Sequence, residues 1–162
     1  MYDDSDPAIQ RLRKLCLALP ETFEKEAWGE CTFRVTGGSM FAMTDNHHHG
    51  SKHIAVWVKA PHDVQEMLVH ADGKRFFVPP YVGAKGWIGI RLDYKVDWEE
   101  LGDILRDAYD MSAPKRLLKL IAGETSLRST SAKRPPAEAA PSRKPRSPRA
   151  RSRSKPARSA RR

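Results

Sequence analysis

Residues 79–92 constrain the fold most strongly, because they combine a rigid start, a tight turn and an alternating strand. Pro79 and Pro80 favour an extended backbone, and Gly83 and Gly86 favour a turn. Residues 87–92 then alternate between two faces, with aliphatic side chains on only one of them. This pattern predicts a half-buried β-strand in a sheet that has one apolar face.

Similar patterns along the chain predict the remaining elements. Strands are expected at residues 32–36, 39–44, 53–59, 76–78 and 87–92. Apolar residues at helical spacing predict helices that begin near Asp6, Pro61, Asp97 and Ser112, and residues 21–30 are interpreted as a polar connection. The expected fold is therefore α+β: a two-layer domain with an antiparallel sheet of about five strands and the helices on one face, in the order helix, three strands, helix, two strands, two helices.

Charge divides the chain into two unequal parts. Residues 128–162 hold 13 of the 29 Lys and Arg residues and one of the 20 Asp and Glu residues, which gives a net charge of +12 there and −3 elsewhere. The basic part consists almost entirely of Arg, Lys, Ser, Pro and Ala, so it offers no large side chains for a core. We therefore expect an α+β domain over residues 1–124 and a disordered basic tail over residues 125–162.

The basic tail predicts binding to a polyanion, with DNA as the expected partner. A block of one charge sign usually marks an interaction arm, and contacts to phosphates make binding non-specific and sensitive to salt. The candidate contacts are Arg143, Lys144, Arg146, Arg149, Arg151, Arg153, Lys155 and Arg158. The alternative is a solubilising extension that has no partner.

A second candidate site is the face of the sheet that does not meet the helices. If the aliphatic residues of 53–59 and 87–92 face the helices, the other side chains of these strands project from the opposite face. That opposite face would carry Arg34, His53, Trp57, Lys59, Trp87 and Arg91. Aromatic rings interleaved with cations can stack bases or hold an anionic ligand. The alternative is that both tryptophans only cover an exposed face or meet a dimer partner.

A pocket near Trp28, Tyr81 and Trp87, with Lys85 in the turn between the last two, is a further possibility. In that case the protein would be a small-molecule- or protein-binding module. An apolar concavity lined by the three rings would favour this interpretation, and a flat, filled surface would count against it.

The histidines are weak candidates for a metal site. His47, His49 and His53 are close in sequence, but no cysteine or fixed carboxylate completes a ligand set, so adventitious metal binding is the favoured interpretation. No cofactor is expected. The two cysteines have no metal spacing, and Cys16 falls on the apolar face of the first helix, which predicts a buried thiol.

Enzyme and membrane signatures are missing from the sequence. There is no Gly-rich phosphate loop, nucleophile elbow or zinc-protease motif, so we expect a non-enzymatic binding protein. No apolar run approaches the length of a membrane span, and the first residues are acidic, unlike a signal peptide. These features predict a cytoplasmic protein, associated with the nucleoid if DNA is its partner.

Several short motifs resemble the MmcQ/YjbR family of small bacterial proteins. They are Leu19-Pro20, Ala27-Trp28-Gly29, Phe33-Arg34-Val35, Met40-Phe41-Ala42, Pro80-Tyr81 and Gly86-Trp87, together with a closing helix over residues 101–109. The resemblance covers residues 8–121. It implies a compact α+β fold similar to secretion chaperones and the double-wing DNA-binding role by which the family is described. It implies nothing about the His-rich loop or the basic tail.

Overall fold

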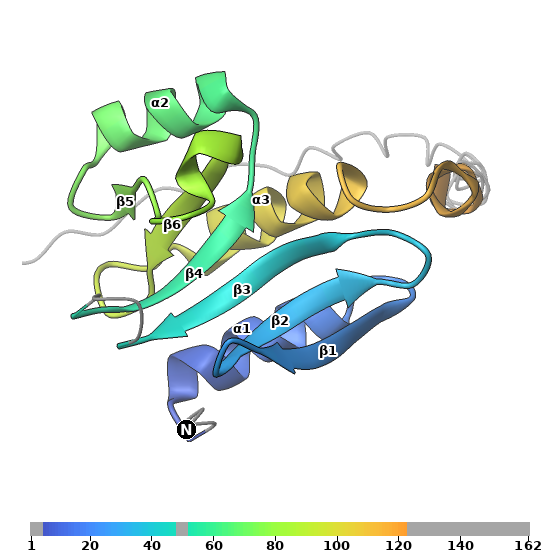
Figure 1. The fold of residues 1–162 in the computed structure, drawn as a ribbon, viewed down its shortest axis with the longest axis horizontal. Helices are drawn as coiled ribbons and strands as arrows, with labels where there is room; N and C mark the ends of the chain where they lie inside the picture. Colours follow the sequence, from blue (N-terminus) through green and yellow to red (C-terminus); the bar gives the residue numbers. More distant parts are fainter. Residues whose placement is uncertain (1–4, 48–51, 123–162) are drawn as a thin grey trace, which may run out of the picture.

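The computed structural model describes residues 5–47 and 52–122 as an antiparallel sheet covered on one side by helices (Figure 1). The elements are α1 (Pro7–Leu17), β1 (Thr22–Ala27), β2 (Glu30–Val35), β3 (Met40–Asn46), β4 (Ile54–Lys59), α2 (His62–Ala71), β5 (Phe76–Phe77), η1 (Gly83–Lys85), β6 (Trp87–Arg91) and α3 (Trp98–Asp110). Residues 115–122 are also helical. The six strands lie in the order β1-β2-β3-β4-β6-β5. The predicted α+β class and antiparallel sheet are confirmed.

Two helix starts follow directly from local side chains. The carboxylate of Asp6 accepts hydrogen bonds from the backbone N–H groups of Ala8 and Ile9, at 2.8 and 3.3 Å, and a proline opens α1. The carboxylate of Asp97 caps α3 in the same way. These caps satisfy N–H groups that have no partner within the helix, which is why both helices begin where the sequence predicts.

The prediction of a polar connection over residues 21–30 is wrong, because six of these residues form β1. This strand lies at one edge of the sheet and pairs only with β2. Edge strands carry charged side chains that would be unusual inside a sheet. Because Glu24, Lys25 and Glu26 are charged, the sequence of this segment does not show the alternation of apolar residues that predicts a strand. The carboxylate of Glu24 is accommodated by an ion pair with Arg13 and a 2.7 Å contact from the thiol of Cys31. The sheet therefore has six strands instead of about five.

The main core lies between the sheet and the helices. Figure 1 shows α1 and α3 on the same side of the strands, and the aliphatic side chains of β4 and β6 pack against them. Helix α2 packs against β5 and β6 and adds Leu68 and Val69 to this core. Phe41 meets Tyr109 edge to face, with ring centroids 6.0 Å apart. None of the described helices is long and apolar enough to cross a bilayer.

The two cysteines are buried, as predicted for Cys16, and neither is part of a disulfide. Both belong to the core beneath α1. Burial, with a smaller contribution from Cys31 and Glu24, raises the pKa of the Cys16 thiol well above its ordinary value. Cys16 is therefore protonated at neutral pH and acts as a small core residue.

Several predictions fall outside the described residues. These are the domain boundary at residue 124, the basic tail over 125–162 with all of its candidate DNA contacts, and His49.

Candidate functional site

A row of side chains crosses the sheet on the face that α1 and α3 leave uncovered. Consecutive cross-strand pairs join Thr32 to Met43, Met43 to Trp57, Trp57 to Gly89, and Gly89 to Phe77. Paired residues place their side chains on the same face. Gly89 is required in this row, because a Cβ atom there would lie 2.3 Å from Cζ of Phe77. The ring of Phe77 therefore lies directly over the backbone of β6.

The two tryptophans expected on this face belong to a second, smaller core. Trp57 is 1% exposed and Trp87 is 7% exposed, and both pack with Met43. Partly buried Met40, Phe77 and Val82 cover them. Alternation places both rings on the expected face, but residues between β5 and β6 fold over them.

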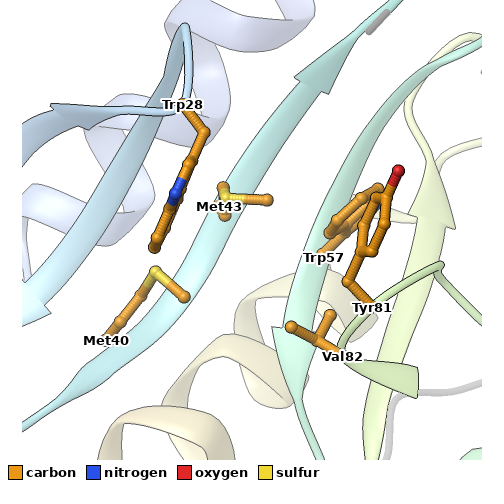
Figure 2. Close-up of a pocket in the computed structure, with 6 residues that line it drawn as sticks. All are labelled: Trp28, Met40, Met43, Trp57, Tyr81 and Val82. Carbon is orange, nitrogen blue, oxygen red and sulfur yellow. The ribbon is translucent and has the colours of Figure 1, made fainter. Parts of the chain in front are cut away.

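A hollow of about 400 Å³ remains above this second core (Figure 2). It is lined by Trp28, Met40, Met43, Trp57, Tyr81 and Val82, and we call it the aromatic slot. Figure 2 shows Trp28 on one side, Tyr81 and Val82 on the other, and Met43 between them. The volume falls within the range of about 300–1,000 Å³ that is usual for ligand pockets. Of the three rings expected around a pocket, the slot contains Trp28 and Tyr81, whereas Trp87 lies in the core beneath.

The two outer walls of the slot adopt backbone conformations that disfavour their side chains. Trp28 has φ 57° and Gly29 has φ 77° in the two-residue turn between β1 and β2, which is the signature of a type I′ turn. Tyr81 has φ 63°. The left-handed region costs a residue with a Cβ atom about 1–2 kcal/mol. Burial does no more than offset this cost, because Trp28 is 68% exposed and Tyr81 is 78% exposed.

A hydrogen-bonded anchor holds the segment that carries Tyr81. The side-chain amide of Gln65, buried in α2, donates to the backbone carbonyl oxygens of Gly83, at 2.8 Å, and Trp87. The amide of Ala60 donates to the carbonyl of Gly86 at 2.8 Å. Tyr81 is thus presented by a segment that is fixed to both α2 and the end of β4. Sequence reasoning missed Gln65, whose only signal was a polar residue on the inner side of a helix.

Three cations lie on the open face or on the segment that carries Tyr81. Arg34 is paired across the strands with Met40, donates to Thr32 Oγ1 at 3.2 Å, and has a guanidinium nitrogen 4.0 Å from the Met40 sulfur. Lys25 is paired with Thr32 and therefore lies on the same face. Lys85 is exposed in η1, four residues after Tyr81 in the chain.

The remaining candidates on this face have partners away from the slot. The ammonium of Lys59 lies 3.4 Å from the carbonyl oxygen of Met111, at the end of α3. Arg91 forms an ion pair with Asp93 at 2.9 Å, which raises the pKa of Arg91 and lowers that of Asp93. His53 Nδ1 lies 3.4 Å from the same carboxylate.

The acidic residues of α3 lie on the other side of the sheet. Glu99, Asp103, Asp107 and Asp110 are all exposed on this helix, which covers the opposite face. Near the slot, Asp45 follows Met43 on β3, but its side chain is fully buried. The exposed acidic residues of α3 therefore lie away from the slot.

The described histidines do not form a metal site. The backbone N–H of His47 donates to the carbonyl of His53 at 3.3 Å, which closes the base of the loop between β3 and β4. Within residues 5–47 and 52–122, no group of three or more His, Cys, Asp and Glu residues could hold a metal ion.

Comparison with known proteins places this arrangement in a family. The sequence profile of YjbR matches residues 17–111, more than half of the chain, and the match includes every residue that lines the slot. The chain belongs to the YjbR family. The comparison with curated proteins finds no significant match to this YjbR protein.

Among the solved structures that are similar to this YjbR protein are two bacterial proteins. The Deinococcus radiodurans protein DR2400, which carries the DUF419 domain, is 26% identical with a TM-score of 0.53, and the match covers 62% of this chain and 75% of that one. A Pseudomonas syringae protein is 11% identical with a TM-score of 0.54, and the match covers 64% of this chain and 97% of the other. The second likeness shows a shared fold only.

Proposed function

We propose that this YjbR protein is a non-enzymatic DNA-binding protein of the cytoplasm. Residues 125–162 supply most of its affinity, and the open face of the sheet adds further contacts. The observation that carries this proposal is the charge division, with a net +12 over residues 128–162 and −3 over the remainder. A segment of one sign attracts phosphates without reading sequence, so binding is non-specific and weakens as salt rises.

The position of the acidic residues supports the same function. A net negative domain would normally repel DNA, but the exposed acids of α3 lie behind the sheet, whereas Lys25 and Arg34 lie on the open face and Lys85 lies in η1, on the segment that carries Tyr81. DNA that is held by the basic segment can therefore approach the open face without meeting the acidic helix.

The test compares the full chain with a variant in which the eight candidate cations of the basic segment are replaced by serine. Affinity for duplex DNA at low salt falls steeply, and the slope of log K against log salt becomes smaller by up to about 7 units, at 0.9 per phosphate contact. Replacing only the six arginines of this set by lysine preserves the charge and serves as the matched control. Equal affinity of the serine variant and the wild type would contradict the proposal.

The aromatic slot favours a second candidate, a small-molecule- or protein-binding module. A hollow of about 400 Å³ with apolar walls suits a planar apolar ligand. This candidate predicts that small aromatic compounds raise the melting temperature of the serine variant as much as that of the wild type, and that excess DNA does not displace them.

A further inference from the structure

We propose that the aromatic slot stacks one unpaired base of single-stranded DNA between Trp28 and Tyr81. The inference rests on the proposed function and identifies the ligand that the open face of the sheet binds. It predicts that the protein binds single strands more tightly than duplexes of the same length, although the basic segment contacts the phosphates of both.

The walls of the slot fit a flat, apolar ring. Trp28 and Tyr81 rise on opposite sides of Met43, and their rings are the two most exposed large apolar side chains of the described chain (Figure 2). Every base has a π-face that stacks on aromatic side chains, so such a site tolerates any sequence. The bases of a duplex are already stacked on each other, and only an unpaired base can enter.

The conformations of the two walls are an independent argument for a ligand. The Trp28-Gly29 turn would be relaxed with Asn at the first position, because Asn-Gly is the preferred pair of a type I′ turn. Tyr81 likewise occupies a backbone region that Gly, Asn and Asp adopt more readily. Strained residues of this kind concentrate at binding sites. Glu21, His47 and Lys95 adopt the same conformation elsewhere, but Trp28 and Tyr81 place large, exposed aromatic rings on two sides of one hollow, which supports contact with a ligand.

Charge complementarity favours a nucleic acid over a neutral ligand. Lys25 and Arg34 extend from the strands beside Trp28 and Met40, and Lys85 lies on the segment of Tyr81. Cations on both sides of a stacking site can meet the phosphates that flank the bound base. Asp45, the acid next to Met43, is fully buried and does not face an approaching phosphate.

The lining also favours DNA over RNA. Five of the six lining residues, all except Tyr81, present no hydroxyl or carbonyl group from a side chain. Apart from the Tyr81 hydroxyl, the side chains of this lining offer a ribose 2′-hydroxyl only indole N–H groups as partners, so the hydroxyl gains little for the water that it loses. Deoxyribose does not carry this cost.

The test uses the full chain and the substitutions Trp28→Asn and Tyr81→Asn. The measured quantity is the single-strand preference, which is the Kd for a duplex divided by the Kd for an oligothymidine of equal length. Each substitution lowers the preference by about 5- to 150-fold, the effect of losing one base–aromatic stack. Duplex affinity stays unchanged, because the basic segment is intact.

The same variants separate binding from folding. Trp28→Asn leaves the Tm near the wild-type value, because relaxing the turn offsets the loss of the part of the ring that is buried. A residue that served only the fold would lower the Tm when replaced. Tyr94→Asn is the matched control, since this ring lies in the loop after β6 against Arg91 and Lys95, outside the slot.

The outcomes distinguish this inference from the proposed function. An unchanged single-strand preference in both slot variants overturns the stacking site and leaves the role of the basic segment standing. A serine variant of the basic segment that binds duplex as tightly as the wild type overturns the proposed function instead. An oligouridine bound as tightly as the oligothymidine overturns the assignment to DNA.

Discussion

The two faces of the sheet follow the same alternation of side chains but are covered in different ways. On one face, α1 and α3 lie over aliphatic residues such as Val56 and Ile88, which are completely buried. On the other face, Trp57 and Trp87 are covered by Val82, from the segment between β5 and β6, together with Met40 of β3 and Phe77 of β5. A helix presents a continuous ridge of side chains, whereas a short irregular segment covers only part of a face. The uncovered remainder is the aromatic slot.

The faces also differ in how they use conformational energy. The helices of the covered face begin at favourable caps, with Asp6 and Asp97 in their preferred positions. The walls of the slot instead place Trp28 and Tyr81 in left-handed backbone conformations. The comparison teaches that the covered face supplies stability, and that the open face retains features that stability alone does not explain.

The largest expected effect comes from the covered face. Leu105→Ala removes a side chain that is 1% exposed and leaves a cavity between α3 and the sheet, so the free energy of unfolding falls by about 2–5 kcal/mol. Urea denaturation measures this change. The single-strand preference at temperatures where the variant is folded stays at the wild-type value, because the slot lies on the other face.

Leu120→Ala is the control for this substitution, since Leu120 is exposed in the last described helix. It changes the free energy of unfolding by less than about 0.5 kcal/mol. A loss of single-strand preference in folded Leu105→Ala would show that the two faces are not independent.

An intermediate effect is expected where the faces meet, at Gln65. Gln65→Ala leaves the carbonyl oxygens of Gly83 and Trp87 without this donor, and an unsatisfied buried acceptor costs about 1–3 kcal/mol. Because the same hydrogen bonds fix the segment of Tyr81, the single-strand preference falls together with stability. Denaturation and DNA titration of one preparation measure both quantities.

Glu66→Ala, at an exposed neighbour on α2, is the matched control and leaves both quantities near their wild-type values. If Gln65→Ala lowered stability but kept the preference, the anchor would serve the fold alone.

The smallest effect is expected at Asp93, at the far end of β6. Hydrogen bonds from Arg91 lower the pKa of this carboxyl below its usual 3.8, so its stabilising contribution is present above that pH and is lost as pH falls through the lowered value. For a partly exposed pair this contribution is about 0.2–1 kcal/mol. Asp93→Asn therefore lowers stability at neutral pH, and the variant and wild type converge in acid.

Thermal unfolding at a series of pH values measures this difference. The single-strand preference does not change, because Arg91 and Asp93 lie outside the slot. A variant that differed from the wild type by the same amount at every pH would argue against titration of Asp93 as the cause.

Much of the fold could be read from local patterns, whereas the site could be read only in part. The caps at Asp6 and Asp97, the hairpin of β2 and β3 and the alternation of β6 are properties of neighbouring residues. Strand β1 was not predicted from the sequence, because its residues are mostly polar. As an edge strand, it is extended mainly because it pairs with β2.

The slot shows the same limit at a longer range. The sequence singled out Trp28 and Tyr81 as aromatic residues next to a glycine or a proline. They line the same hollow only because β2, β3 and β4 pair between them. Their positive φ values run against the preferences of their side chains, so no propensity could have predicted them. Gln65 donates hydrogen bonds to backbone carbonyls of a distant segment, and every residue has such a carbonyl, so the sequence could not predict these partners.

The unequal burial of the tryptophans gives the protein an optical probe of its own. Trp57 and Trp87 are shielded from solvent and Trp98 is partly shielded, whereas Trp28 is 68% exposed at the mouth of the slot. Long-wavelength emission and quenching by a neutral solute such as acrylamide will therefore come mainly from one indole. Binding of a molecule in the slot can therefore be detected in the unlabelled wild-type protein as a change in the fluorescence of Trp28.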